Sequence, residues 1–247
     1  MSSNAASAGP AERPVGLALV GPTASGKTAL SIELARALAG EIISMDSRQV
    51  YRRMDVGTAK ATPDEQAAAP HHGFDLVEPD ERFSAGRFAG YARARIADIE
   101  ARGRVPILVG GTGFFLSALT RPLFREPPLD DDRRRALERA LRDVDDETLR
   151  AYVEALDPRT AASLAQGGGR QRMLRALEVA LLTGRALSWW HEHAPPAEAP
   201  LRFLTVLLDL ERVELDRRID ARVRAMIDAG LVDEVRALLD DGVRPDA

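Results

Sequence analysis

The feature that most constrains this chain is the run GPTASGKT at residues 21–28, which lies between an apolar stretch and a helical pattern. It matches G-x-x-x-x-G-K-[ST], in which a glycine-rich loop turns its backbone N–H groups toward phosphate oxygens. Gly21 and Gly26 permit this wrapping, Lys27 supplies a point charge, and the following helix N-terminus adds a positive dipole. The hydroxyl of Thr28 is the expected Mg²⁺ ligand. We expect a diphosphate or a nucleotide to be bound by the whole loop: Gly21, Pro22, Thr23, Ala24, Ser25, Gly26, Lys27 and Thr28.

Apolar and helical patterns alternate along the first half of the chain, which predicts βαβ units around a parallel sheet. Three short apolar runs predict buried strands, at residues 15–20, 41–45 and 105–109. After Pro122 the pattern is helical to Trp190, and a strand pattern returns at residues 201–210. We therefore expect an α/β fold, a P-loop NTPase-like parallel sheet flanked by helices, with an all-helical insertion. The expected parts are a disordered tail (1–14), the core (15–121), the insertion (122–195) and the return to the core (196–247).

Composition narrows the class of protein. The 247 residues are 45% hydrophobic and 29% charged, as in ordinary globular domains. The absence of cysteine excludes disulfides, thiolate catalysis and cysteine-ligated metals. No apolar run reaches the ~20 residues that span a bilayer, so we expect a cytoplasmic protein without membrane contact. The net charge of −4 argues against indiscriminate nucleic-acid binding but leaves room for a local basic patch.

Lysine is nearly absent, which makes the two lysines informative. Of 34 basic residues only Lys27 and Lys60 are lysine. A compact ammonium and a planar guanidinium do different work, so each retained lysine is a candidate functional residue. For Lys60 the alternative is an ordinary solvated loop lysine.

Two aspartates follow predicted strands. Asp46 ends the second strand, at the carboxyl edge where open α/β sheets bind ligands. It is either a proton acceptor or a capping residue. Asp209 follows the later strand and is either the Mg²⁺ aspartate of an NTPase or a turn residue. The Mg²⁺ interpretation would favour a nucleotide-gated binding module. No Asn-Lys-x-Asp segment occurs, so we do not expect a GTPase.

Four runs together resemble the tRNA dimethylallyltransferase (tRNA isopentenyltransferase) family: GPTASGKT, DSRQVYRRMDVGTAK, LVGGTGFF and RQRMLRALEV. Their order and spacing agree from about residue 15 to residue 239. The resemblance implies transfer of a dimethylallyl group from dimethylallyl diphosphate to N6 of adenosine 37 in tRNA, with Mg²⁺. The acceptor base would be flipped out of the anticodon loop. The alternatives are an adenylate (cytokinin-type) isopentenyltransferase and a P-loop small-molecule kinase, and the helical insertion favours tRNA.

The resemblance also implies roles by position. Asp46 matches the general base, Thr112 a contact beside the reaction channel, and Arg218 and Arg222 the arginines that neutralise diphosphate. The positions implied to contact tRNA are Asp46, Ser47, Arg48, Gln49, Thr112, Arg134, Gln171, Arg172, Met173, Leu174 and Arg175. On its own, the arginine face of the insertion is also typical of a solvated helix. We expect a monomer that binds the anticodon stem-loop.

Two departures from the family pattern carry expectations of their own. Gly169 stands where many relatives have an aspartate, which predicts a weaker N-cap for the helix that follows. The resemblance also implies a Gly-Tyr motif and a basic helix after Ala247. Without that C-terminal segment we expect weaker RNA binding.

Overall fold

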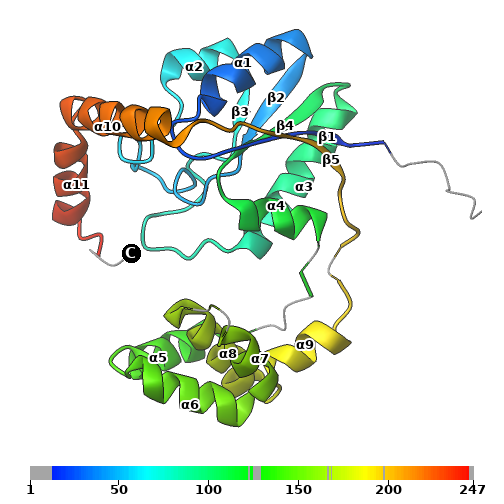
Figure 1. Ribbon diagram of the computed structural model, residues 1–247, viewed down its shortest axis with the longest axis vertical. Helices are drawn as coiled ribbons and strands as arrows, with labels where there is room; N and C mark the ends of the chain where they lie inside the picture. The colour runs from blue at the N-terminus through cyan, green and yellow to red at the C-terminus, as the bar shows by residue number, and fades with distance from the viewer. Residues whose placement is uncertain are drawn as a thin grey trace, which may run out of the picture. The chain divides into compact units, whose positions relative to one another are not determined.

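The computed structural model describes residues 13–121, 123–124, 129–165, 167, 169–196 and 198–244. It divides into an α/β unit, Met1–Arg121 with Pro200–Ala247, and a helical unit, Pro122–Ala199 (Figure 1). The structure thus returns to the α/β unit at Pro200, whereas the sequence analysis placed the return at residue 196. Residues 1–12 of the expected tail lie outside the described part. Within that part, no helix has both the length and the apolar character needed to cross a membrane.

The α/β unit contains a parallel sheet of five strands among the described residues, in the order β3-β2-β4-β1-β5. The strands are β1 (Gly16–Val20), β2 (Gly40–Ser44), β3 (His71–His72), β4 (Val105–Gly110) and β5 (Phe203–Leu207). The helices are α1 (Lys27–Ala37), α2 (Pro63–Ala68), α3 (Ala85–Ala101), α4 (Gly113–Thr120), α10 (Arg212–Asp228) and α11 (Leu231–Asp240). This confirms the predicted fold class, while β3 was not predicted because two residues carry no periodicity.

Helices cover both faces of the sheet at β2 and β4, which explains the continuous apolar sequence of these strands. On one face, Ile32 of α1 packs against Ile42 of β2 and Ile107 of β4. Successive strand residues point to opposite faces, so Ile43 and Leu108 lie on the other side. There α3 packs against β2 and β4 (Figure 1). Packing against α1 on one face and α3 on the other holds β2 and β4, and therefore the residues at their ends, in place.

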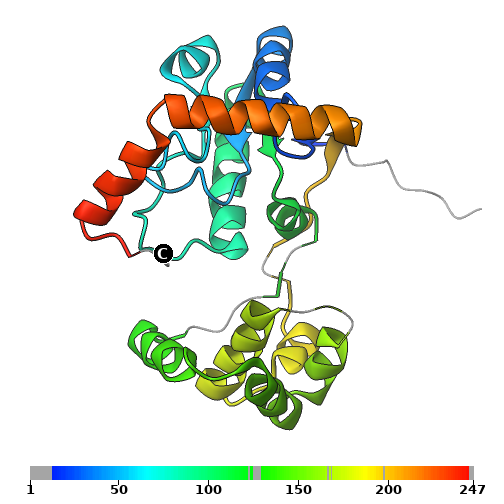
Figure 2. The same cartoon turned by 60° about the vertical axis from the view of Figure 1, so that its left-hand side comes forward.

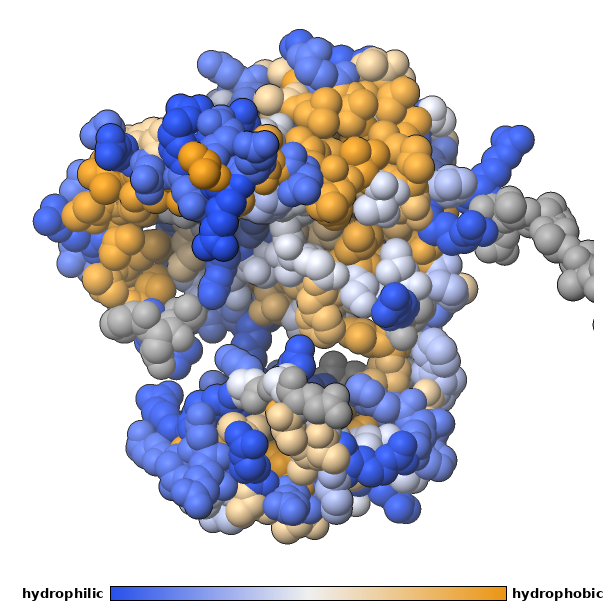
Figure 3. All heavy atoms as spheres, viewed as in Figure 1, coloured by the Kyte–Doolittle hydropathy of each residue, from blue (hydrophilic) through white to orange (hydrophobic). Residues whose placement is uncertain are grey.

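The last strand leaves an apolar edge. Strand β5 pairs with β1 on one side, and no strand among the described residues pairs with its other side. Its Leu204, Val206 and Leu207 are all substantially exposed. Figure 3 shows apolar residues gathered over a broad area of the α/β unit.

After β5 the chain forms two helices that frame the site. Figure 2 shows α10 running across the α/β unit and leading directly into α11. The two helices are joined at Gly230, whose φ of 97° lies in the left-handed region that favours glycine. Leu231, the first residue of α11, packs close to Gly57.

The helical unit has its own core. Its helices are α5 (Asp131–Leu141), α6 (Asp146–Leu156), α7 (Pro158–Leu164), α8 (Arg170–Thr183) and α9 (Leu187–His193). Buried residues of four of these helices pack together, among them Leu141, Leu149, Leu164 and Leu177. Aspartate side chains cap α5, α6 and α7, whereas α8 starts at Gly169 without a side-chain cap, as predicted.

Candidate active site

The P-loop joins β1 to α1 in a strained, closely packed turn. Ala24 and Gly26 both have left-handed φ values, 61° and 91°. A Cβ atom on Gly21 would lie 2.6 Å from the carbonyl oxygen of Leu208, so a side chain there would clash with backbone. Gly26 immediately precedes α1, which points the helix N-terminus at the loop. The geometry is that of an anion cradle.

Lys27 is held inside this loop. Its Nζ donates hydrogen bonds to the carbonyl oxygens of Gly21, at 3.0 Å, and Pro22, at 2.5 Å. Burial lowers the pKa of Lys27, the charge of Arg222 lowers it further, and the charge of Asp46 opposes them. Both charges therefore act on the ammonium across the site.

Helix α10 brings two arginines to the P-loop. A Cβ atom on Gly26 would lie 3.9 Å from Nη1 of Arg218, so this guanidinium lies over the loop. Arg222 follows one turn later on the same helix. Glu214 orients Arg218 by accepting a hydrogen bond from its Nε at 2.6 Å. Hydrogen bonds from Arg217 and Arg218 lower the pKa of Glu214 to about 2, so it stays ionised.

Asp46 and Thr112 lie together at the carboxyl edge of the sheet. Strands β2 and β1 both flank β4, so the segment after β2 and the P-loop share this edge. Oδ1 of Asp46 accepts a hydrogen bond from the backbone N–H of Arg48 at 2.8 Å. The N–H of Ser47 donates to Oγ1 of Thr112 at 3.3 Å. Asp46 thus makes the capping contact with one oxygen, and no hydrogen bond to Oδ2 is present among the described residues.

Gln49 and Lys60 have their side chains engaged within the chain, at the loop of residues 53–60. Nε2 of Gln49 donates to the carbonyl oxygens of Thr58 and Ala59, at 3.1 and 3.0 Å, so its amide group is used within the chain. The side chain of Lys60 is only 5% exposed and is paired with two aspartate carboxylates. The interpretation of Lys60 as a solvated loop lysine is therefore wrong, because burial and ion pairing hold it in the fold.

The described residues build no acidic metal centre around the P-loop. Asp209 is exposed and follows β5, whose pairing with β1 continues as Leu208 N–H donates to the carbonyl of Val20 at 2.8 Å. Thr28 is exposed in the first turn of α1. In the described part of the chain, no three acidic or histidine side chains gather as metal ligands.

In the helical unit the candidate arginines are already paired. Nε of Arg134 contacts Oε1 of Glu178, and Nη1 of Arg175 lies 3.4 Å from the same oxygen. Nη1 of Arg172 donates to the carbonyl of Gly167 at 3.1 Å. Two arginines from different helices therefore converge on one carboxylate, which differs from a freely solvated arginine face.

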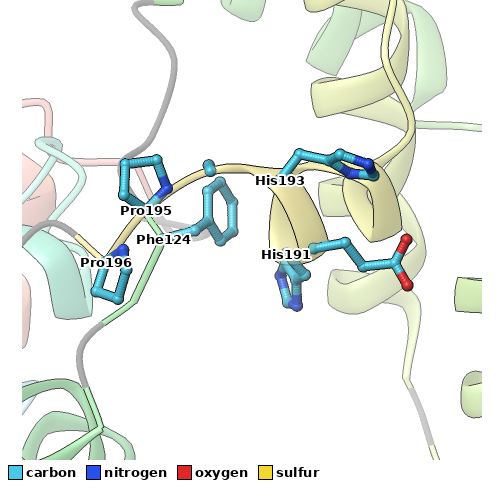
Figure 4. Close-up of a pocket in the computed structure, with 7 residues that line it drawn as sticks. Phe124, His191, His193, Pro195 and Pro196 are labelled. Atoms are coloured by element: carbon cyan, nitrogen blue, oxygen red, sulfur yellow. The ribbon is translucent and has the colours of Figure 1, made fainter.

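The remaining candidates of α8 divide by burial. Gln171 is exposed, Leu174 is half-buried, and Met173 is 2% exposed in the core of the helical unit. The side chain of Met173 is thus not available to RNA, because its helical position faces the core. A hollow in the same unit is lined by Phe124, Pro195, Pro196 and the end of α9 (Figure 4). It contains none of the candidate site residues.

Sequence reasoning missed two carboxylates that support the site. Glu214 stands four residues before Arg218, and this helical spacing of opposite charges could have revealed it. Glu234 of α11 accepts hydrogen bonds from backbone N–H groups more than 170 residues away in the sequence. No local sequence pattern predicts a contact between residues so far apart in the chain.

Two family models and several curated proteins match this chain. A family model described as IPP transferase matches residues 49–247, and one described as isopentenyl transferase matches residues 16–69. The tRNA dimethylallyltransferase of Roseiflexus castenholzii is 52% identical over 228 residues, covering 92% of this chain and 73% of the relative. That of Methylococcus capsulatus is 50% identical over 230 residues, with the same coverage.

Solved structures show the same similarity. A full-length tRNA isopentenylpyrophosphate transferase from Bacillus halodurans has a TM-score of 0.60 at 39% identity, covering 93% of this chain and 71% of that one. A eukaryotic dimethylallyltransferase acting on tRNA has a TM-score of 0.73 at 29% identity, covering 94% of this chain and 58% of that one.

Proposed function

The chain belongs to the family of tRNA dimethylallyltransferases, and from this premise we propose how its P-loop and the edge of β2 carry out the transfer. The chain transfers a dimethylallyl group to tRNA. The donor is dimethylallyl diphosphate, bound by its diphosphate in the P-loop. The acceptor is N6 of adenosine 37 in the anticodon loop, bound at the segment that begins with Asp46. Both halves of the site lie within one chain, so no second copy is needed to complete it, and the proposed acting form is the monomer.

Three cations around one loop are the observation that carries the proposal. Lys27 lies within the P-loop, Arg218 lies over it, and Arg222 acts electrostatically on Lys27. An exocyclic amine is a weak nucleophile, so the C1–O bond of the donor must be largely broken before N6 bonds to C1. Negative charge then collects on the departing diphosphate, and preorganised positive charge stabilises it where it forms.

The proton balance assigns Asp46 its role. As N6 bonds to C1, the C1–O bond breaks and the diphosphate leaves with the electron pair. The surplus proton on N6 passes to Asp46, whose Oδ1 is already oriented by the N–H of Arg48. The target nucleotide is proposed to contact Ser47, Arg48 and Thr112, which lie at the same edge of the sheet. Gln49 would support this segment through its hydrogen bonds to Thr58 and Ala59.

The residues at the P-loop fit a Mg²⁺ ion that takes ligands from both the protein and the diphosphate of the donor. The exposed hydroxyl of Thr28 offers one protein ligand at the start of α1. The described residues hold no group of three acidic or histidine side chains that could bind a metal ion, so the other ligands would be phosphate oxygens and water, as is usual for Mg²⁺. When bound, the ion would offset charge on the leaving diphosphate.

The helical unit is proposed to hold the anticodon stem-loop. Gln171 and Arg172 are exposed at the start of α8, and Arg134 and Arg175 share Glu178. Arginines that follow one another along a helix suit the phosphate backbone of RNA, which a free mononucleotide lacks. This favours tRNA over free adenylate as the acceptor.

Asp46→Asn tests the proposal, with Asp209→Asn as the matched control at the same sheet edge. Turnover with dimethylallyl diphosphate and an anticodon stem-loop should fall by roughly 10²–10⁴ in Asp46→Asn, the range for loss of a general base. Donor affinity should stay unchanged, and the control should resemble the wild type. Full turnover in Asp46→Asn would reduce this residue to its capping contact. Loss of donor binding in the control, or thermal stabilisation by ATP in place of the donor, would favour a kinase or a nucleotide-gated module.

A further inference from the structure

Two carboxylates of helix α11 and its C-cap hold the distant loop of residues 53–60: Asp241 pairs with Nη1 of Arg53 at 2.7 Å, and Glu234 accepts three backbone hydrogen bonds. Oε2 of Glu234 accepts hydrogen bonds from the N–H groups of Asp55, at 2.8 Å, and Val56, at 2.7 Å. Its Oε1 accepts from the N–H of Gly57 at 2.9 Å. A Cβ atom on Gly57 would lie 2.9 Å from Cδ1 of Leu231, so glycine lets the helix approach this closely.

The buried Lys60, the last residue of this loop, makes a second set of contacts that fix its shape. Its ammonium donates to the carbonyl oxygen of Tyr51 at 3.0 Å, to Oδ1 of Asp55 at 2.5 Å and to Oδ1 of Asp75 at 2.8 Å. The backbone N–H of Asp55 therefore donates to Glu234, while its side-chain carboxylate accepts from Lys60. The loop has little freedom to change shape while both contacts persist.

This loop in turn holds the segment that begins with Asp46. The carbonyl oxygens of Thr58 and Ala59 accept the two hydrogen bonds of the Gln49 amide. Oε1 of Gln49 accepts a third from Oγ of Ser44 at 2.7 Å. Gln49 is three residues from Asp46, so the path of residues 46–49 depends on where the loop carbonyls lie.

We propose that Glu234 is a positioning residue for the acceptor nucleotide, acting through the 53–60 loop and Gln49 on the segment 46–49. The inference rests on the proposed function, because it takes this segment as the acceptor side. A carboxylate is needed because three consecutive N–H donors require acceptors on both oxygens. Glutamine would offer one oxygen and turn an NH₂ group toward a donor. Among the described residues, no hydrogen bond of Glu234, Lys60 or the Gln49 side chain reaches the donor half of the site, built on β1, α1 and α10.

The test compares Glu234→Gln with Asp233→Asn, an exposed neighbour on α11 whose carboxylate pairs with Arg236 on the same helix. In Glu234→Gln the KM for an anticodon stem-loop should rise roughly tenfold, as expected for the loss of charge-assisted hydrogen bonds. The KM for dimethylallyl diphosphate should stay within about twofold of the wild-type value. Asp233→Asn should leave both constants unchanged.

A second variant, Gly57→Ala, disturbs the same junction without altering charge and should raise the acceptor KM in the same selective way. A lower melting temperature with both KM values unchanged would show that Glu234 only stabilises the fold, and would overturn the inference. Equal shifts in both KM values would overturn it as well. A wild-type chain that transfers nothing to tRNA would refute the proposed function and this inference with it. An active wild type with Glu234→Gln equal to Asp233→Asn would refute this inference alone.

Discussion

At the scale of single residues, this chain separates the work of lysine from that of arginine. It carries 32 arginines and two lysines, and the structure gives both lysines confined positions. Lys27 contacts two loop carbonyls within the P-loop, and Lys60 contacts two carboxylates and a carbonyl. Both sites suit a compact ammonium with three donors and would crowd a planar guanidinium.

Lys27→Arg should lower the affinity for dimethylallyl diphosphate by about tenfold or more although the charge is kept, because the guanidinium does not fit the loop. The wild-type affinity should also fall as the pH rises through the pKa of Lys27, which burial and Arg222 hold below the ordinary lysine value. Arginine stays charged, so the variant should show a flat profile. Calorimetric titration with a donor analogue from neutral to alkaline pH measures both effects. Arg36→Lys, on the exposed side of α1, is the control, and wild-type affinity in Lys27→Arg would contradict the argument.

At the scale of secondary-structure elements, one buried carboxylate ties together the amino-terminal side of the sheet. Glu41 of β2 is 4% exposed at its side chain. Its Oε2 lies 2.6 Å from Nε2 of His72 in β3 and accepts from Nη2 of Arg102, after α3, at 2.7 Å. Its Oε1 accepts from Nη1 of Arg104, just before β4, at 3.1 Å. Burial would raise the pKa of Glu41, but the hydrogen bonds from His72 and Arg102 outweigh it and lower the pKa.

Glu41→Gln should therefore lower the free energy of unfolding by about 2 kcal/mol at neutral pH. This is below the usual cost of breaking a buried pair because both arginines reach solvent. A depressed carboxyl pKa gives stability that is complete above the ordinary glutamate value and is lost as the pH falls through the folded-state value. The difference between variant and wild type should thus shrink on acidification. Urea unfolding at several pH values measures it.

Glu33→Gln on α1 is the matched control for Glu41→Gln, because Glu33 forms an exposed pair with Arg36. It should change the free energy of unfolding by less than about 0.5 kcal/mol at every pH. A pH-independent loss in Glu41→Gln would mean that packing, and not the charge of Glu41, is what the substitution removes.

At the scale of the whole molecule, the donor site and the proposed stem-loop contacts of α5 and α8 belong to units with separate cores. The core of the helical unit is formed by its own helices, with Leu149 and Leu177 fully buried. The P-loop and α10 belong to the α/β unit. Stability of one unit and binding by the other should therefore be separable.

Leu177→Ala should destabilise the helical unit by about 2–5 kcal/mol, through lost burial and the cavity left behind. Affinity for dimethylallyl diphosphate should be unchanged, whereas binding of an anticodon stem-loop should weaken. Hydrogen exchange resolved along the chain measures the first effect, and titrations measure the others. Leu181→Ala, at an exposed position of α8, should do little. Equal loss of protection in both units would show that they unfold as one.

The sequence by itself determined the local features. Strands β1, β2 and β4, the P-loop and the weak N-cap at Gly169 were predicted and found. The helical insertion was recognised from its pattern alone. These features rest on apolar periodicity, glycine and capping chemistry, whose interacting groups lie within a few residues of one another. The resemblance to a family implied functional roles for single residues, but it did not show which groups these residues contact.

Only the tertiary structure decided how distant groups meet. It placed Arg218 over Gly26, buried Lys60 between two aspartates, used the Gln49 amide within the chain and turned Met173 into the core. It also seated Glu234 on the N–H groups of residues 55–57. These contacts join residues from five to nearly two hundred positions apart, and no local periodicity encodes the partner of a buried charge. Which donor meets Glu234 or Glu214 depends on how α10 and α11 pack in the α/β unit, so these contacts are seen only in the folded chain.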